Sequence, residues 1–186
     1  MESALTAAGR QVRVIEDCLN GRRTVWDDPF KAGRNGLVGL AQRIEIHSPL
    51  GLVMLMLGTN DFQSVHAFTA YHSAQGIATL VNAIRQAPIE PGMPVPPILV
   101  IAPPAIGSSR GPMEHTFAGA ARKSAGLAAA YQEVSATLGC HFFDAGAVIG
   151  TSAVDGVHLD ADQHLHLGTA LAAVVAKLPL PGEAGG

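Results

Sequence analysis

Leu52-Val53-Met54-Leu55-Met56-Leu57-Gly58-Thr59-Asn60-Asp61 is an apolar run that stops abruptly at a glycine and three polar residues. Six consecutive apolar residues without alternation are typical of a strand that is buried on both faces of a parallel sheet. A glycine at the end of such a strand permits a sharp turn of the backbone. The stretch therefore predicts a buried strand that delivers polar side chains to one edge of a sheet.

Strand-like and helix-like patterns alternate along the rest of the chain. Strands are predicted at 11–16, 52–57, 98–102 and 140–143, and helices at 2–9, 35–45, 70–87, 117–138 and 159–178. This alternation indicates a flavodoxin-like three-layer α/β/α sandwich with a parallel sheet. We expect one domain over 1–178 and a disordered Gly- and Pro-rich tail over 179–186.

The composition describes a compact globular protein. Of the 186 residues, 48% are hydrophobic and 15% are charged, and the net charge is -3. The basic residues are scattered, so the sequence predicts no nucleic-acid partner. No apolar stretch approaches the ~20 residues that span a bilayer, so no membrane partner is expected. Cys18 and Cys140 are expected to be buried, reduced thiols, which favours a cytoplasmic location unless an export signal precedes Met1.

Four polar loops follow the predicted strands. They begin at Cys18, Gly58, Pro103 and Asp144. Ligands of parallel α/β sheets bind outside the carboxyl ends of the strands. These loops are therefore expected to meet at one edge of the sheet and to form the site there.

The loop that begins at Asp144 contains the pair Asp155 and His158, three positions apart in a turn. Asp155 can accept the Nδ1 proton of His158, which leaves Nε2 free to act as a base. The alternative is a surface turn with a solvated histidine.

Two further residues can donate hydrogen bonds to an oxyanion. Asn60 can present its NH2 group over the sheet edge, although an ordinary turn that caps the following segment has the same pattern. Gly21, after Asn20, can offer a backbone N–H, or it can simply belong to a tight turn with positive φ.

These motifs resemble three of the four conserved blocks of the SGNH (GDSL) hydrolases. The stretch Val14–Thr24, the stretch Phe142–Gly146 and the ending Val154–His158 are similar to the small arylesterase and acyltransferase branch, and the resemblance covers about 2–178. It implies serine-type hydrolysis or acyl transfer on small acyl or aryl esters, without cofactor or metal.

The resemblance also implies a role for each matching residue. His158 would be the general base and Asp155 the carboxylate that orients it. Asn60 and the Gly21 N–H would be the oxyanion-hole donors. The loop 22–34 would help to build a narrow acyl pocket and subunit contacts, so a homo-oligomer is expected.

The first block of the family, a Gly-Asp-Ser turn after a central first strand, is absent from the sequence. Met1-Glu2-Ser3-Ala4-Leu5 corresponds to the helix that follows this block. Either the chain is N-terminally truncated, or the protein is a non-catalytic relative that binds a small ligand or a partner subunit. Retention of the other site residues favours truncation.

No other residue is predicted to replace the missing serine. The candidate serines lie on no strand-turn-helix elbow that would present a hydroxyl; they are Ser48, Ser108, Ser109 and Ser152. Cys18 is expected to be structural. A metal site is not predicted either, because Asp162, His164 and His166 fall on different faces of a helix.

Overall fold

The computed structural model describes residues 1–181 of the chain. The helices are α1 (Glu2–Ala7), α2 (Leu40–His47), α3 (Ala70–Arg85), α4 (Ala120–Lys123), α5 (Leu127–Thr137) and α6 (Ala161–Val175), with 3₁₀ turns η1 (Thr59–Phe62), η2 (Gly111–Met113) and η3 (Ala145–Ala147). The strands are β1 (Val53–Leu55), β2 (Ile98–Ala102) and β3 (His141–Asp144). Within residues 1–181, none of the helices combines the length and the apolar character needed to cross a bilayer.

The strands form one parallel sheet in the order β1-β2-β3. Val53 pairs with Ile98 at one end, and Ala102 pairs with Asp144 at the other. All five residues of β2 are buried, as the continuous apolar pattern predicts. β1 is shorter than the predicted strand 52–57 and is buried fully only at Leu55, because it lies at an edge of the sheet.

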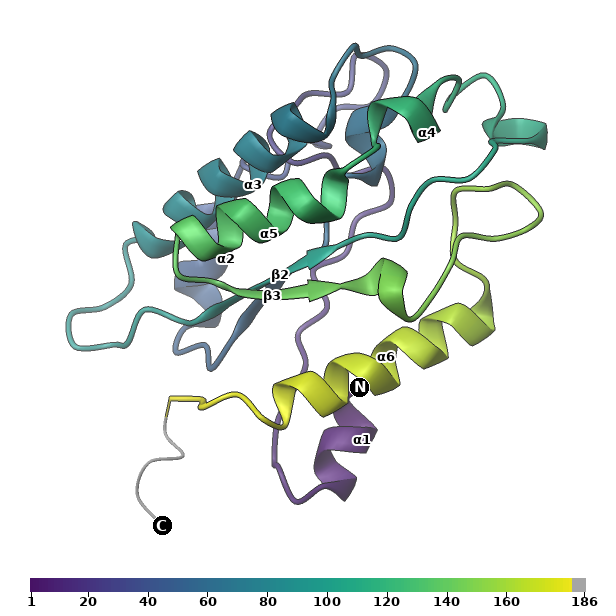
Figure 1. Cartoon of the computed structure of the whole chain (residues 1–186). Coiled ribbons are helices and arrows are strands. Elements are labelled where there is room, and N and C mark those ends of the chain that lie inside the picture. The colour runs from purple at the N-terminus through teal and green to yellow at the C-terminus, as the bar shows by residue number, and fades with distance from the viewer. Residues whose placement is uncertain (182–186) are drawn as a thin grey trace.

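Helices cover both faces of the sheet (Figure 1). α2, α3 and α5 lie on one face, and α1 and α6 lie on the other. Successive side chains of a strand point to opposite faces. Val100 accordingly packs in the first core cluster with Ile77 and Leu80, and Leu99 packs in the second with Leu171. The predicted three-layer α/β/α sandwich is confirmed.

α1 and the segment that follows it are held against the second core cluster and α6. Leu5 of α1 is 2% exposed and packs in the second cluster. The guanidinium of Arg10 donates to the carbonyl oxygens of Val175 (2.8 Å) and Leu178 (3.0 Å). These bonds tie the segment after α1 to the C-terminal end of α6 and to the residues that follow it.

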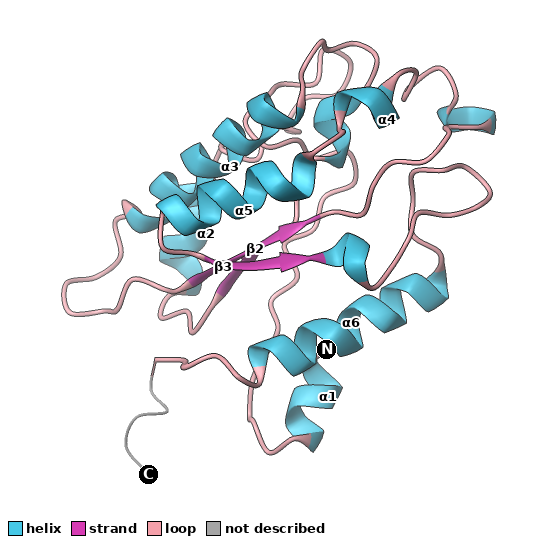
Figure 2. Cartoon of the chain, viewed as in Figure 1, coloured by secondary structure: helices cyan, strands magenta, loops and turns pink. Residues whose placement is uncertain are grey.

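The predicted strand 11–16 is wrong. Figure 2 shows the chain between α1 and α2 as loop, and Ile15 is 44% exposed. The backbone N–H of Val14 donates to the Glu2 carboxylate (2.7 Å) instead of to a neighbouring strand. An alternating pattern gives strand propensity, but a strand forms only where a neighbour accepts its backbone hydrogen bonds. Cys18, just beyond this segment, is exposed, so its predicted burial is also wrong.

The predicted single helix 117–138 is wrong as well, because the chain forms α4 and α5 instead. Gly126 separates them with a left-handed backbone (φ 81°) and caps the N-terminus of α5. Gly39, with φ 72°, likewise caps the N-terminus of α2. This helix therefore begins at Leu40 and not at residue 35 as predicted. Of the predicted tail, Leu180 packs against the second core cluster, and residues 182–186 lie outside the described residues.

Gly76→Ala should destabilise the protein. Alanine usually stabilises an exposed helix interior relative to glycine by ~1 kcal/mol. Gly76, however, is buried on α3, and a Cβ there would collide with the Thr24 side chain. We expect the free energy of unfolding to fall by about 1–3 kcal/mol, the usual cost of overpacking, in urea denaturation. A gain in stability would show that α3 and the Thr24 loop are not in close contact.

Candidate active site

The loops at the carboxyl edge of the sheet are joined to one another by backbone hydrogen bonds. The N–H of Gly107, after β2, donates to the oxygen of Gly156 (2.8 Å), after β3. The N–H of Ser64, after β1, donates to Thr116 O (2.7 Å). The loop that contains Arg22 joins them through the Asn60 side chain. The expected convergence of four loops is therefore present.

Asp155 and His158 are in direct contact. Nδ1 of His158 lies 2.6 Å from Oδ2 of Asp155, while Oδ1 accepts the backbone N–H groups of Val157 (2.8 Å) and His158 (3.0 Å). Gly156 shapes the turn with φ 75°, and a Cβ there would collide with the backbone of Ser108. The His158 side chain is 57% exposed, against 19% for Asp155. The ring is therefore oriented by the carboxylate and open to solvent.

The hydrogen bonds of Asp155 decide its charge. The contact with His158, together with the Val157 N–H, lowers the pKa of Asp155 to about 2. The group is therefore a carboxylate at neutral pH, and it accepts a hydrogen bond from the Nδ1–H of His158. Such an arrangement fixes the tautomer that leaves Nε2 as the free base.

Asn60 lies in η1, directly after the strand end at which Gly58 turns the chain. Gly58 has φ 122°, and a Cβ there would collide with the Tyr131 hydroxyl. Nδ2 of Asn60 donates to the carbonyl oxygen of Arg22 (3.2 Å). The structure thus brings Asn60 to the residue that follows Gly21.

Gly21 occupies the turn closed by the hydrogen bond from the Arg22 N–H to Leu19 O (3.0 Å). Its φ of 80° is a conformation that residues with a side chain rarely adopt. The Arg34 side chain lies against it, 3.6 Å from where a Cβ would be. Gly21 and Asn60 are therefore neighbours, and their roles as oxyanion donors stay predictions.

A buried carboxyl group, Asp61, holds these two loops together. It is 0% exposed and accepts hydrogen bonds from the Thr24 N–H (2.9 Å), the Thr24 hydroxyl (2.7 Å) and the Ser73 hydroxyl (2.7 Å). Ser73 also contacts the Tyr131 hydroxyl (2.7 Å), which donates to Leu57 O (3.0 Å). Burial raises the pKa of Asp61 despite these donors.

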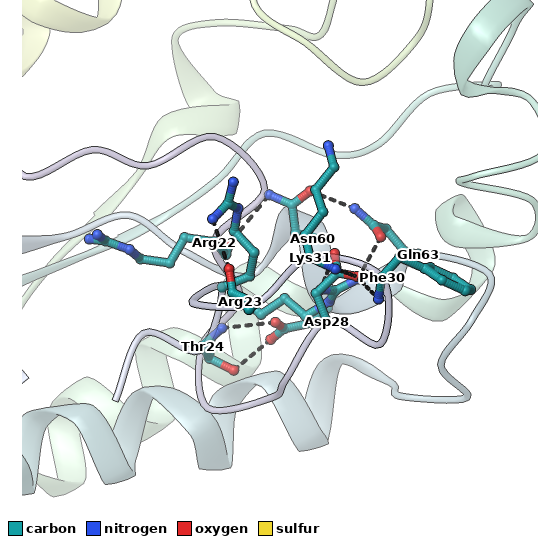
Figure 3. A network of polar contacts seen from close by, with 11 residues as sticks. Arg22, Arg23, Thr24, Asp28, Phe30, Lys31, Asn60 and Gln63 are labelled. Atoms are coloured by element: carbon teal, nitrogen blue, oxygen red, sulfur yellow. Dashed lines mark hydrogen bonds and ion pairs between the residues drawn. The ribbon is translucent and has the colours of Figure 1, made fainter. Parts of the chain in front are cut away.

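Sequence reasoning missed the roles of Asp61, Arg23 and Gln63. Arg23 is 0% exposed and reaches Gln63, which in turn reaches Asn60 (Figure 3). The only sequence signal was an aspartate placed directly after the strand-ending turn. Arg23 and Gln63 lie 40 positions apart, so no local spacing connects them.

The hydroxyls of three of the four candidate serines are bonded elsewhere or buried, and the fourth, Ser108, is exposed in the loop after β2. The Ser48 hydroxyl donates to Ile44 O (2.7 Å), and that of Ser109 donates to Phe117 O (3.3 Å). Ser152 is 4% exposed and accepts from the Val154 N–H. Within residues 1–181, the His158 ring is hydrogen-bonded to Asp155 alone. The same part of the chain contains no cluster of three His, Cys, Asp or Glu side chains that could hold a metal ion.

Comparison with known proteins identifies the family. Residues 2–174 match the model of the GDSL-like lipase/acylhydrolase family, and the chain belongs to this family. The sequence-based resemblance to SGNH (GDSL) hydrolases is thereby confirmed. No curated protein matches the chain.

Solved structures of several proteins are similar over nearly the whole chain. The inhibitor-bound aryl esterase of M. smegmatis superimposes with a TM-score of 0.89 at 34% identity, over 96% of this chain and 85% of that one. Est24, a carbohydrate acetylesterase from Sinorhizobium meliloti, superimposes with a TM-score of 0.87 at 36% identity, over 94% of this chain and 83% of that one. Family and neighbours indicate an SGNH-type esterase or acylhydrolase.

The two aspartates of the site should affect stability in opposite directions as the pH changes. Folding favours the protonated form of Asp61, because its pKa is raised. The stability that this group contributes is present below about pH 4 and is lost as the pH rises through its folded-state pKa. Asp155, with a pKa of about 2, contributes stability above about pH 4, which is lost as the pH falls toward the folded-state value.

Chemical unfolding of wild type, Asp61→Asn and Asp155→Asn across the acidic and neutral range would measure both effects. As the pH rises, the stability of the wild type should decrease relative to Asp61→Asn and increase relative to Asp155→Asn. Parallel pH dependences of the two variants would contradict the assigned environments.

Proposed function

We propose that this chain carries the proton-transfer and oxyanion-binding groups of a serine-type ester hydrolase or acyltransferase that acts on small acyl or aryl esters. The observation that carries the proposal is the 2.6 Å contact between His158 and Asp155, with the imidazole exposed at the loop-bearing edge of the sheet. A solvent-exposed imidazole oriented by an ionised carboxylate is suited to general base catalysis.

In the proposed reaction, Nε2 of His158 takes the proton of a serine hydroxyl as its oxygen attacks the ester carbonyl. The C–O bond forms, the carbonyl oxygen becomes an oxyanion, and Asn60 Nδ2 and the Gly21 N–H donate to it. His158 then gives its proton to the departing alcohol, and the acyl group stays on the serine. Water or a second alcohol repeats these steps in reverse and removes the acyl group.

The attacking serine is proposed to lie in a segment that precedes Met1. In residues 1–181, the hydroxyls of Ser48 and Ser109 are bound to backbone oxygens, and Ser152 is buried. Ser108 is exposed, but it lies within a loop and not on a strand-turn-helix elbow that would present its hydroxyl. The chain accounts for 85% of the length of the M. smegmatis aryl esterase that it resembles. A segment ahead of Met1 would supply the Gly-Asp-Ser turn that the family resemblance implies.

The loop after Gly21 is proposed to form subunit contacts in a homo-oligomer. Phe30 is 84% exposed, and Val38, a few residues further on, is 63% exposed. Apolar side chains this open to water are stabilised when another protein surface covers them. A neighbouring subunit would also exclude water from the acyl pocket and favour transfer to an alcohol over hydrolysis.

His158→Ala should abolish turnover of a small aryl acetate by the form of the protein that includes the upstream segment. Loss of the base should reduce kcat by at least about 10⁴-fold, because neither serine activation nor leaving-group protonation remains. His164→Ala is the matched control, since His164 is exposed on α6, and it should leave kcat unchanged. Unchanged turnover in His158→Ala would eliminate the assigned base.

Labelling with a fluorophosphonate should locate the nucleophile. The 186-residue chain should show little turnover and no labelled residue, whereas the longer form should be labelled at a serine ahead of Met1. A label within residues 1–186 would place the nucleophile in this chain.

A stop codon just upstream of Met1, with no activity in any form, would favour the non-catalytic alternative.

A further inference from the structure

The proposed role of Asn60 requires that its amide present nitrogen, not oxygen, to the oxyanion. A side-chain amide is nearly symmetric in shape, so only its hydrogen-bond partners decide which atom points where. Oδ1 of Asn60 accepts from Nε2 of Gln63 (3.0 Å), and Nδ2 faces the Arg22 carbonyl oxygen (3.2 Å). Gln63 and the Arg22 carbonyl oxygen therefore both require this orientation of Asn60, and Gln63 is the partner that a side-chain substitution can change.

The amide of Gln63 could also point either its oxygen or its NH2 group toward Asn60, and Arg23 decides which. Nη2 of Arg23 donates to Oε1 of Gln63 (2.6 Å). A guanidinium offers only donors, so Gln63 must turn its oxygen to Arg23 and its NH2 group to Asn60. Figure 3 shows Gln63 reaching Asn60 through one end of its amide and the arginine through the other. The order of donors and acceptors is thus fixed from Arg23 to Asn60.

Arg23 cannot turn away from Gln63 easily. It is 0% exposed, and its Nη1 pairs with Oδ2 of Asp28 (2.7 Å). Oδ1 of Asp28 accepts the N–H groups of Phe30 (2.8 Å) and Lys31 (3.0 Å). Burial tends to raise the pKa of Asp28, but the Phe30 N–H and Arg23 outweigh it and hold the pKa below its usual value. The start of the chain of hydrogen bonds is therefore a fixed ion pair.

The backbone of Gln63 is held independently of its side chain. Nζ of Lys123, on α4, donates to the carbonyl oxygens of Gln63 (2.9 Å) and His66 (2.8 Å). Replacement of the Gln63 side chain would leave these contacts in place. Side-chain variants at position 63 can therefore be made without loosening the loop.

We propose that Gln63, oriented by Arg23, is a positioning residue that keeps the NH2 group of Asn60 turned toward the oxyanion. The inference rests on the proposed function, in which Asn60 is an oxyanion donor. It adds that the donor depends on an arginine and a glutamine that are themselves neither the base nor an oxyanion donor in the proposed reaction. Preorganised donors stabilise a transition state because they need no reorganisation when charge develops.

Gln63→Glu is the informative substitution. It keeps the size of the side chain but replaces the NH2 group that donates to Asn60 with an oxygen that can only accept. The new carboxylate would accept from Arg23, but it would also present an acceptor to Asn60. Two oxygens facing each other repel, and a carboxylate is a stronger acceptor than the neutral Arg22 carbonyl, so the Asn60 amide should rotate and turn its NH2 group from Arg22 to position 63. Its oxygen would then lie on the side of Arg22, where the proposed donor was, while the ion pair with Arg23 preserves the fold.

Neutron diffraction on the 186-residue chain tests the orientation without any need for activity. In the wild type, the deuterons of the Asn60 amide should face the Arg22 carbonyl, and in Gln63→Glu they should face residue 63. The same orientation in both proteins would overturn the proposal. Gln75→Glu, the same change at an exposed position of α3, should leave Asn60 as in the wild type.

Kinetics of the active, longer form then distinguish the positioning role of Gln63 from the oxyanion role of Asn60 on which it rests. Gln63→Glu should lower kcat for an aryl acetate by about 10²–10³-fold with little change in KM, as Asn60→Ala should. The double variant should be no slower than Asn60→Ala alone. If Asn60→Ala leaves kcat unchanged, the oxyanion assignment fails. If Asn60→Ala is slow and Gln63→Glu is not, the positioning role fails.

Discussion

The buried carboxyl group of Asp61 is the constraint on which the candidate site depends. It is wholly buried and takes three hydrogen bonds, two from Thr24 and one from Ser73. Thr24 belongs to the loop of Gly21, and Asp61 follows Asn60 directly. A buried polar group without partners is costly, so the two loops are held in the one arrangement that satisfies this carboxyl group. The relative position of the two predicted oxyanion donors follows from it.

Two glycines make this arrangement sterically possible. At Gly58, a Cβ would collide with the hydroxyl of Tyr131, which itself contacts Ser73 beneath the loop. At Gly76, a Cβ would collide with Thr24. The polar network thus requires close approach of β1, α3 and the loop that follows Gly21, and only glycine permits it at these positions. Glycines that look like ordinary helix and turn residues in the sequence are packing requirements of the site.

Sequence patterns predicted those features that depend on local periodicity or on spacing within one turn. They include the buried strand at 98–102, the three layers, and the contact of Asp155 with His158. Patterns failed where a partner decides the outcome. Segment 11–16 has strand propensity but lies in a loop, since its Val14 N–H finds a carboxylate and not a strand. The link from Arg23 to Gln63 spans 40 positions, and no local pattern encodes it.

The two halves of the candidate site differ physically, and the difference fits the tasks proposed for them. Asn60 is fixed through Gln63 by an arginine that is wholly buried, whereas the His158 ring is 57% exposed and held by one carboxylate. An oxyanion donor stabilises charge only to the extent that its dipole is already aligned, so rigidity serves it. A general base must receive a proton and later return it to a different atom, so a ring fixed at Nδ1 and free at Nε2 serves that role. The fold therefore places its buried polar network under the proposed donors and leaves the proposed base in an open turn.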